Sequence, residues 1–226
     1  MERHFDEELK ELKAKLLQMA SLAEESIARA IKALVERDKK LAEEVIKSDE
    51  AINFLEIDVD ELCLRLLALR QPIATDLRFI TSAFKINSDL ERIGDLSVNI
   101  AQRALDLMEE PLLKPLIDIP RMAQLAQKMV KDSLDAFVNR DAELARDVCR
   151  RDDEVDNLNH QIFRELLTFM IQDPKTITRS VDLILIGRHL ERIADHATNI
   201  GEDVVYIVKG KTIKHHIEEK IGKSGK

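Results

Sequence analysis

The chain has few of the residues that interrupt helices or support other folds. Its 226 residues include six glycines, five prolines, one tyrosine and no tryptophan. Charged residues make up 35% of the chain and hydrophobic residues 45%, which is typical of long amphipathic helices and not of strands or disordered segments. The sequence therefore predicts an all-α protein.

A surplus of positive charge is also missing. The formal net charge is −8 and the isoelectric point is near 5.4. Proteins that bind nucleic acid neutralise phosphates with clustered Lys and Arg, so this balance argues against a nucleic-acid partner. Anions are therefore not expected as default partners.

Cysteines and long apolar runs are scarce as well. Cys63 and Cys149 have no Cys-x-x-Cys spacing, so we expect free thiols among apolar helical positions and not a disulfide. No run of about 18 apolar residues occurs, and residues 1–10 are too highly charged for a signal peptide. The sequence predicts a cytoplasmic protein that does not insert into a membrane.

One segment occurs twice in the chain. Residues 90–100 read Leu-Glu-Arg-Ile-Gly-Asp-Leu-Ser-Val-Asn-Ile, and residues 190–200 read Leu-Glu-Arg-Ile-Ala-Asp-His-Ala-Thr-Asn-Ile. The turn that begins at Arg37-Asp38 is likewise repeated at Arg140-Asp141. Similarity at such a long period indicates a duplicated unit.

Apolar residues spaced by three and four positions predict three long helices in each half. The first three helices are expected at about 5–34, 38–70 and 72–108, with Pro72 in the first turn of the third. Three prolines between 109 and 120 mark a connection. After it we expect a fourth helix that begins near 121, a fifth that ends near 172 and a sixth that ends near 209. This gives two tandem three-helix bundles of long antiparallel helices, residues 1–112 and 113–210, followed by a flexible tail, 211–226.

Acidic residues form stripes beside the apolar faces of these helices. Glu91 and Asp95 lie four positions apart, on a different side of the helix from Leu90 and Ile93. The preceding helix has a second stripe with spacings of four, three and four, and its members are Asp49, Asn53, Glu56 and Asp60. If the two stripes face each other, their oxygen atoms converge on one surface patch.

The second half repeats this arrangement in part. Glu191 and Asp195 correspond to the first pair, and Asp153 and Asn157 are the positions expected to match Asp49 and Asn53, followed by His160 and Arg164. Oxygen ligands suit Mg, Ca, Mn or iron better than zinc, so each half is a candidate metal site. The alternative is an ordinary solvated helix face, on which Arg92 and Arg192 form weak ion pairs with these carboxylates.

No familiar catalytic centre can be assembled from the sequence. Glu-x-x-His, the histidine-containing motif of helix-bundle di-iron enzymes, does not occur, and neither do the common hydrolase or phosphate-loop motifs. His189 and His196 are expected to be partly buried and hydrogen-bonded. A carboxylate-bridged metalloenzyme is therefore a weaker hypothesis than a protein that binds partners.

Three segments together resemble the PhoU family of phosphate uptake regulators. These are Arg-Gln-Pro-Ile-Ala-Thr-Asp-Leu-Arg at 70–78, Leu-Glu-Arg-Ile-Gly-Asp at 90–95, and Glu-Arg-Ile-Ala-Asp-His-Ala-Thr-Asn-Ile at 191–200. The resemblance extends to about Gly210, in two copies and with the family's length.

The resemblance implies a cytoplasmic, often dimeric regulator that is not an enzyme. Such a regulator links the phosphate-specific ABC transporter to a membrane sensor histidine kinase, and restrains the phosphate-starvation genes when phosphate is plentiful. A general helical adaptor or a chaperone-assisting bundle is the alternative, because three-helix bundles serve many roles.

Some members of the family hold iron or another divalent metal on similar carboxylate motifs. The resemblance implies ligand sets of Asp49, Glu91 and Asp95, and of Asp153, Glu191 and Asp195. The chain departs from the family motif at Asn53 and Asn157, where a carboxylate would be a stronger ligand.

Overall fold

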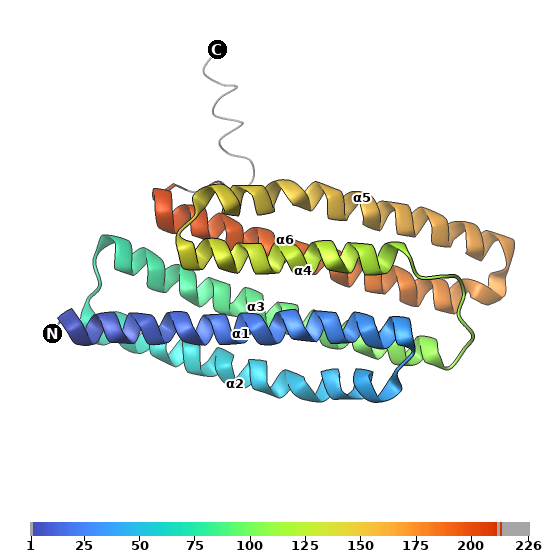
Figure 1. Ribbon diagram of the computed structural model, residues 1–226, viewed down its shortest axis with the longest axis horizontal. Coiled ribbons are helices and arrows are strands. Elements are labelled where there is room, and N and C mark those ends of the chain that lie inside the picture. The colour runs from blue at the N-terminus through green and yellow to red at the C-terminus, as the bar shows by residue number, and fades with distance from the viewer. Residues whose placement is uncertain (1, 212, 214–226) are drawn as a thin grey trace, which may run out of the picture.

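The computed structural model describes residues 2–211 and 213, with side chains from Phe5 onward. The described chain is helical throughout except for short connections, which confirms the all-α prediction (Figure 1). Its elements are α1 (Glu2–Glu36), α2 (Lys39–Arg70), α3 (Ala74–Met108), α4 (Asp118–Asn139), α5 (Ala142–Gln172), the short 3₁₀ helix η1 (Pro174–Thr176) and α6 (Ile177–Lys209). The predicted tail, 211–226, lies almost wholly outside the described residues.

Four helix ends are fixed by a capping side chain or by a glycine. Asp38 and Asp141 precede α2 and α5, and their carboxylates accept hydrogen bonds from the backbone N–H groups of Leu41 and Leu144, respectively. Asp173 accepts in the same way from Lys175, with Pro174 at the start of η1. Gly210 follows α6 with a φ of 67°, the left-handed conformation that glycine adopts without steric cost. Local chemistry thus sets these boundaries.

Two boundaries differ from the sequence prediction. Pro72 is not in the first turn of α3, because Ile73 occupies the N-cap position and the helix begins at Ala74. Helix α4 begins at Asp118 and not near Arg121. Pro120 therefore lies in the first turn of α4, where its missing N–H would have had no partner within the helix.

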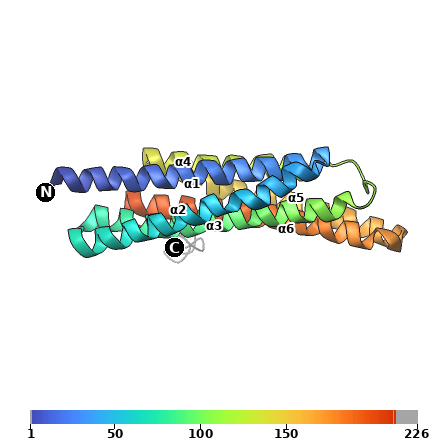
Figure 2. The same ribbon diagram turned by 90° about the horizontal axis from the view of Figure 1, so that it is seen from below.

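The six helices form two three-helix bundles placed side by side. In each bundle all three helices pack against one another, α1 with α2 and α3, and α4 with α5 and α6. The bundles meet along two seams, where α3 packs against α6 and α1 packs against α4. Figure 2 shows α1 and α4 together in the upper layer of the view, with α3 and α6 below them.

One apolar core runs through both bundles. It is built mainly from Leu, Ile, Val and Ala, and a stacked pair of rings, Phe79 and Phe137, has centroids 5.3 Å apart across α3 and α4. Both cysteines are free thiols, with Cys63 buried and Cys149 partly buried. Burial raises the pKa of Cys63 to about 12 and that of Cys149 to about 11, so both stay protonated at neutral pH.

The seam between α3 and α6 also contains ion pairs. Lys85 lies 3.3 Å from the carboxylate of Asp203, and Arg103 lies 3.2 Å from that of Asp182. Both carboxylates are buried, so these contacts fix the two bundles relative to each other. Within the described residues, no helix is long and apolar enough to cross a membrane.

Candidate functional site: two acidic clusters

The repeated segments lie in the middle of α3 and α6, and they divide into faces as their spacing predicts. Leu90 and Ile93 are fully buried, and so are Leu190 and Ile193. Glu91, Asp95 and Glu191 are only partly buried, and Asp195 is exposed. The acidic residues therefore border the core without entering it.

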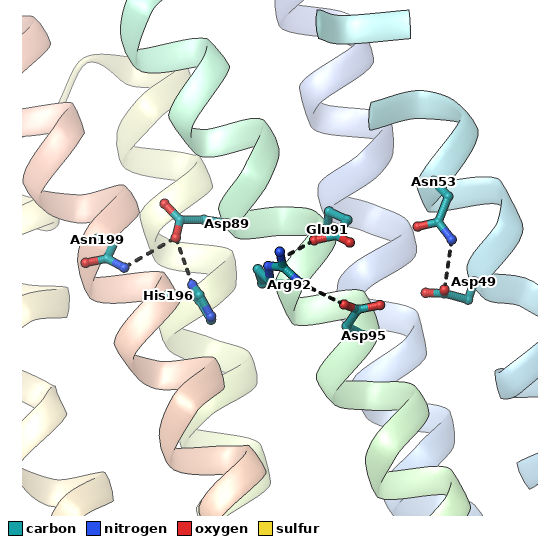
Figure 3. Close-up of polar contacts among 8 residues, drawn as sticks. All are labelled: Asp49, Asn53, Asp89, Glu91, Arg92, Asp95, His196 and Asn199. Atoms are coloured by element: carbon teal, nitrogen blue, oxygen red, sulfur yellow. Dashed lines mark hydrogen bonds and ion pairs between the residues drawn. The ribbon is translucent and has the colours of Figure 1, made fainter. Parts of the chain in front are cut away.

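The first acidic cluster lies between α2 and α3 and comprises Asp49, Asn53, Glu56, Glu91 and Asp95. Figure 3 shows Asp49 and Asn53 on α2, and Glu91 and Asp95 on the neighbouring turns of α3. The Asn53 amide donates to Asp49 Oδ2 at 3.0 Å, whereas Asp49 Oδ1 is buried and has no protein hydrogen-bond partner.

Gly94 allows α2 and α3 to approach closely at the first acidic cluster. A Cβ atom at this position would lie 2.9 Å from Ile52 Cδ1 and 3.2 Å from Asp49 Oδ1.

Asp49, Glu56 and Glu91 in this cluster all have raised pKa values. Burial is the main cause of the raised pKa values of Asp49 and Glu91, and the negative charge of Asp95 raises both further. The Arg92 guanidinium offsets part of this repulsion, at 3.4 Å from Glu91 and 3.3 Å from Asp95. The ion pairs expected of Arg92 are thus present.

The second acidic cluster lies between α5 and α6 and comprises Asp152, Asp156, Glu191 and Asp195. Burial and then the charges of Asp195 and Asp156 raise the pKa of Asp152 to about 6. Burial and the charges of Glu191 and Asp156 likewise raise the pKa of Asp195. Asp152 Oδ1 is buried without a protein hydrogen-bond partner, as Asp49 Oδ1 is in the first cluster.

This arrangement corrects the residues predicted on α5. Asp153 and Asn157 are exposed, and the Asn157 amide donates to the backbone carbonyl of Asp153 instead of joining the cluster. Because one position rotates a helical side chain by about 100°, Asp152 and Asp156 are the residues that face α6.

The sequence contained the signal for the correct register. Arg37-Asp38 and Arg140-Asp141 are 103 positions apart, and the same interval leads from Asp49 to Asp152 and from Asn53 to Asp156. The predicted pairing used an interval of 104 positions. In the correct register the second cluster has a carboxylate at Asp156 where the first has the amide of Asn53.

Besides the ion pairs between α3 and α6, another polar contact joins the two bundles near the acidic clusters. His196 Nδ1 lies 2.8 Å from Asp89 Oδ1, and Asn199 donates to the same oxygen at 3.3 Å (Figure 3). The partly buried, hydrogen-bonded role expected of His196 is therefore correct. His189 is partly buried as expected, but its Nδ1 is buried without a protein hydrogen-bond partner, and burial lowers the pKa of its imidazole.

The donor atoms of the clusters suit a hard divalent cation. They are carboxylate and amide oxygens. Asp49 Oδ1 in the first cluster, and Asp152 Oδ1 and Glu191 Oε2 in the second, are buried without a hydrogen-bond partner, although Glu191 Oε2 lies 3.3 Å from the Arg188 guanidinium. In the described part of the chain, however, no group of three His, Cys, Asp or Glu residues is arranged to hold a metal ion. Metal binding therefore stays a prediction that would require small movements of these side chains.

Comparisons with known proteins agree on one family. A model of the family described as "PhoU domain" matches residues 16–104 and 119–204, the two repeats. A protein from Aquifex aeolicus named phosphate-specific transport system accessory protein PhoU homolog is 47% identical over 214 residues, covering 94% of this chain and 97% of the relative. A Pseudomonas putida protein of the same name is 43% identical and covers 94% of this chain and 84% of the relative.

Solved structures show the same similarity in three dimensions. The crystal structure of PhoU from Pseudomonas aeruginosa has a TM-score of 0.89 at 43% identity, covering 92% of this chain and 100% of that one. The phosphate transport system regulatory protein PhoU from Streptococcus pneumoniae has a TM-score of 0.86 at 35% identity, covering 93% and 99%. With both repeats matched in sequence and in fold, the chain belongs to the PhoU domain family.

Proposed function

We propose that this protein is an accessory regulator of a phosphate-specific transport system. One observation carries the proposal: a relative with that name matches 94% of this chain and 97% of its own length at 47% identity. The shared region includes both bundles and both acidic clusters. In this role the protein limits phosphate uptake and restrains the phosphate-starvation genes when phosphate is plentiful.

The proposed mechanism is docking and not catalysis. The protein would act in the cytoplasm, as a homodimer, and contact the transporter's cytoplasmic subunit and a sensor histidine kinase. Helices of up to 35 residues, about 50 Å long at 1.5 Å per residue, offer an extended surface for two partners. The acidic clusters border that surface. Burial first, and then neighbouring negative charges, raise the pKa values of Asp49 and Asp152, and a cationic partner group would relieve the repulsion between the carboxylates.

A divalent cation, iron among the candidates, is proposed as a ligand of the clusters. Asp49, Glu91 and Asp95 would hold it in the first cluster, and Asp152, Glu191 and Asp195 in the second. When bound, the cation would supply the positive charge that these carboxylates lack, which would lower their pKa values.

Direct binding tests the docking role. Purified chain is titrated into the transporter's ATP-binding subunit, and separately into the cytoplasmic part of the kinase, by calorimetry. The Glu91→Ala/Asp95→Ala variant is compared with Glu43→Ala/Glu50→Ala, which removes the same charge from exposed positions of α2 outside the cluster. We expect the cluster variant to bind at least about tenfold more weakly and the control to bind normally. Binding to neither partner by the unmodified chain would refute the docking mechanism.

A further inference from the structure

An exposed apolar strip runs along the α5/α6 hairpin. Its six members are Phe163, Leu167 and Ile171 on α5, and Ile177, Val181 and Leu185 on α6. Each row steps by four positions, so its side chains share one face of the helix. The two helices are antiparallel, joined through η1 and packed together, so the rows lie side by side.

The exposure of this strip is high for large apolar side chains. It ranges from 37% for Leu167 and Leu185 to 82% for Ile171. Contiguous exposed apolar surface of this kind marks interaction sites, whereas scattered exposed residues need no explanation.

The other half of the molecule shows that folding does not require the strip. By the repeat, the equivalent positions of the α2/α3 hairpin are Asp60, Leu64, Ala68, Leu77, Thr81 and Lys85. Other apolar residues, such as Phe54 and Ile73, are exposed in that half, but polar and charged side chains interrupt these six positions. Leu64 and Leu77 are exposed at two of the equivalent positions, and Ile57, Leu69 and Phe84 are exposed elsewhere on α2 and α3, so both hairpins expose apolar surface. The unbroken run of six apolar residues occurs only at the second-half positions.

The surroundings of the strip are basic, although the whole chain has a net charge of −8. His160, Arg164, Lys175, Arg188 and Arg192 are all exposed beside it. Arg188 pairs with Glu191 at 3.3 Å, whereas Arg164, Lys175 and Arg192 have no carboxylate within ion-pair distance in the described part of the chain. Two exposed acids lie nearby: Asp173 accepts the backbone N–H of Lys175, and Asp195 follows on α6 within the electrostatic reach of Arg188.

The geometry points to docking of an amphipathic helix whose apolar face is flanked by acidic residues. Two antiparallel helices whose apolar rows lie side by side form a groove that can bind a third helix, as α5 and α6 bind α4 within their own bundle. The acidic flanks would pair with Arg164, Lys175 and Arg188 at the rim. This inference stands independently of the phosphate-related role.

Charge disfavours two other occupants of the strip, a second copy of this chain and an anionic membrane. A second copy docked through the same strip would bring the basic rims of both chains together. An anionic membrane would extend past the strip along the hairpin, where Asp152, Asp156 and Asp195 follow on the same seam, and would be repelled there. A short acidic helix confined to the strip meets neither obstacle.

The test uses two labelled helical peptides with the same leucine face, one flanked by glutamates and one by lysines. Their binding to the full chain is measured by fluorescence anisotropy. We expect the acidic peptide to bind at least about tenfold more tightly than the basic one. Equal affinity for both peptides, or no binding of the acidic one, would overturn the proposal.

Matched variants locate the site. Leu167→Glu and Ile177→Glu in the strip are compared with Leu64→Glu and Leu77→Glu at the equivalent exposed positions of the first half. The strip variants should weaken binding of the acidic peptide at least about tenfold and the first-half variants should not, with all four as helical as the parent chain. Equal losses in both halves would contradict the assignment. Two further results would contradict it: a dimer of the parent chain that Leu167→Glu dissociates, which would assign the strip to a second copy, and tighter binding to phosphatidylserine vesicles than to the acidic peptide, which would assign it to a membrane.

Discussion

Asp49 Oδ1 and Asp152 Oδ1 occupy equivalent positions in the two halves, and both are buried without a protein hydrogen-bond partner. An unsatisfied buried oxygen costs about 1–3 kcal/mol of folding stability, and the charges of neighbouring carboxylates add to that cost. A cation with several oxygen ligands would relieve both effects at once. Substitutions of single residues in the clusters can therefore test metal binding and charge repulsion separately.

Metal binding should depend on Asp152 and not on its neighbour Asp153. After chelator treatment, readdition of iron or manganese should give stoichiometric metal by elemental analysis in the parent chain and in Asp153→Asn. Asp152→Asn should retain about half as much, because only the second cluster loses a ligand. If the parent chain retains no metal, the solvated-face interpretation of the carboxylates is correct.

The stability of the metal-free protein should depend on pH through Asp152. Its pKa is about 6 in the folded chain, above its ordinary value of 3.8, so the folded state holds the proton more tightly between these two values. Its contribution to stability therefore increases as the pH falls from 7 towards 4. At pH 7, with chelator present, Asp152→Asn should raise the free energy of unfolding by about 1 kcal/mol after allowance for solvent screening.

The control for this effect is the low-pH comparison. At pH 4 Asp152 is largely protonated, so the two chains should differ little in urea unfolding. A gain for Asp152→Asn that is the same at pH 4 and pH 7 would contradict the charge repulsion described for this cluster.

The sequence predicted the first cluster better than the second for a definite physical reason. Helical spacing alone placed Asp49 on one stripe and Glu91 and Asp95 on another, and the structure shows that the two stripes face each other. In the second half, Asp152 and Asp153 are adjacent acids, and only the repeat interval distinguishes the one that faces α6. An error of one position turned the predicted pair, Asp153 and Asn157, towards solvent.

At the scale of helices, predictions were accurate where one residue determines the boundary. Asp38, Asp141 and Gly210 act through their own side chain or backbone conformation, so the sequence is sufficient to place them. The start of α4 was missed because Pro120 is compatible both with a loop and with a first helical turn. Only the packing of Ile119 into the core decides between these alternatives.

Close contact between α5 and α6 depends on Gly201. A Cβ atom there would lie 2.9 Å from the backbone carbonyl oxygen of Ala145, which cannot move without displacing α5. Gly201→Ala should therefore lower the free energy of unfolding by about 1–3 kcal/mol, in spite of the better helix propensity of alanine.

Gly94→Ala provides the comparison for this prediction. The Cβ atom of an alanine at this position would first meet the end of the flexible Ile52 side chain. Gly94→Ala should therefore lower the free energy of unfolding, measured in urea, by less than Gly201→Ala does. Equal losses at both positions would contradict the difference between a backbone and a side-chain obstacle.

For the whole molecule, apolar packing joins the two bundles, and the ion pairs between α3 and α6 help to fix their relative position. Arg103→Ala would leave the buried carboxylate of Asp182 without its cation, and we expect a loss of about 1–3 kcal/mol in the free energy of unfolding. Arg92→Ala removes an exposed guanidinium from within one helix and should cost less than about 0.5 kcal/mol. Denaturant unfolding of both variants checks this, and a larger loss for Arg92→Ala would refute the account of the seam.

Contacts across this seam could not be predicted from the sequence. Asp89 and His196 are 107 positions apart, and nothing local to either residue indicates the other. Their meeting depends on how the two bundles are placed, which the duplication leaves open. The family and the all-α fold followed from repeated motifs, whereas the placement of the bundles required the structure.

The central claim, that this protein regulates phosphate uptake, is tested most directly by gene expression in its own host. A reporter fused to a phosphate-starvation promoter is measured at high and low phosphate in a deletion strain, with and without the restored gene. We predict high expression at both phosphate levels in the deletion strain, and repression at high phosphate when the gene is restored. Normal repression in the deletion strain would contradict the proposed function and favour a general helical adaptor.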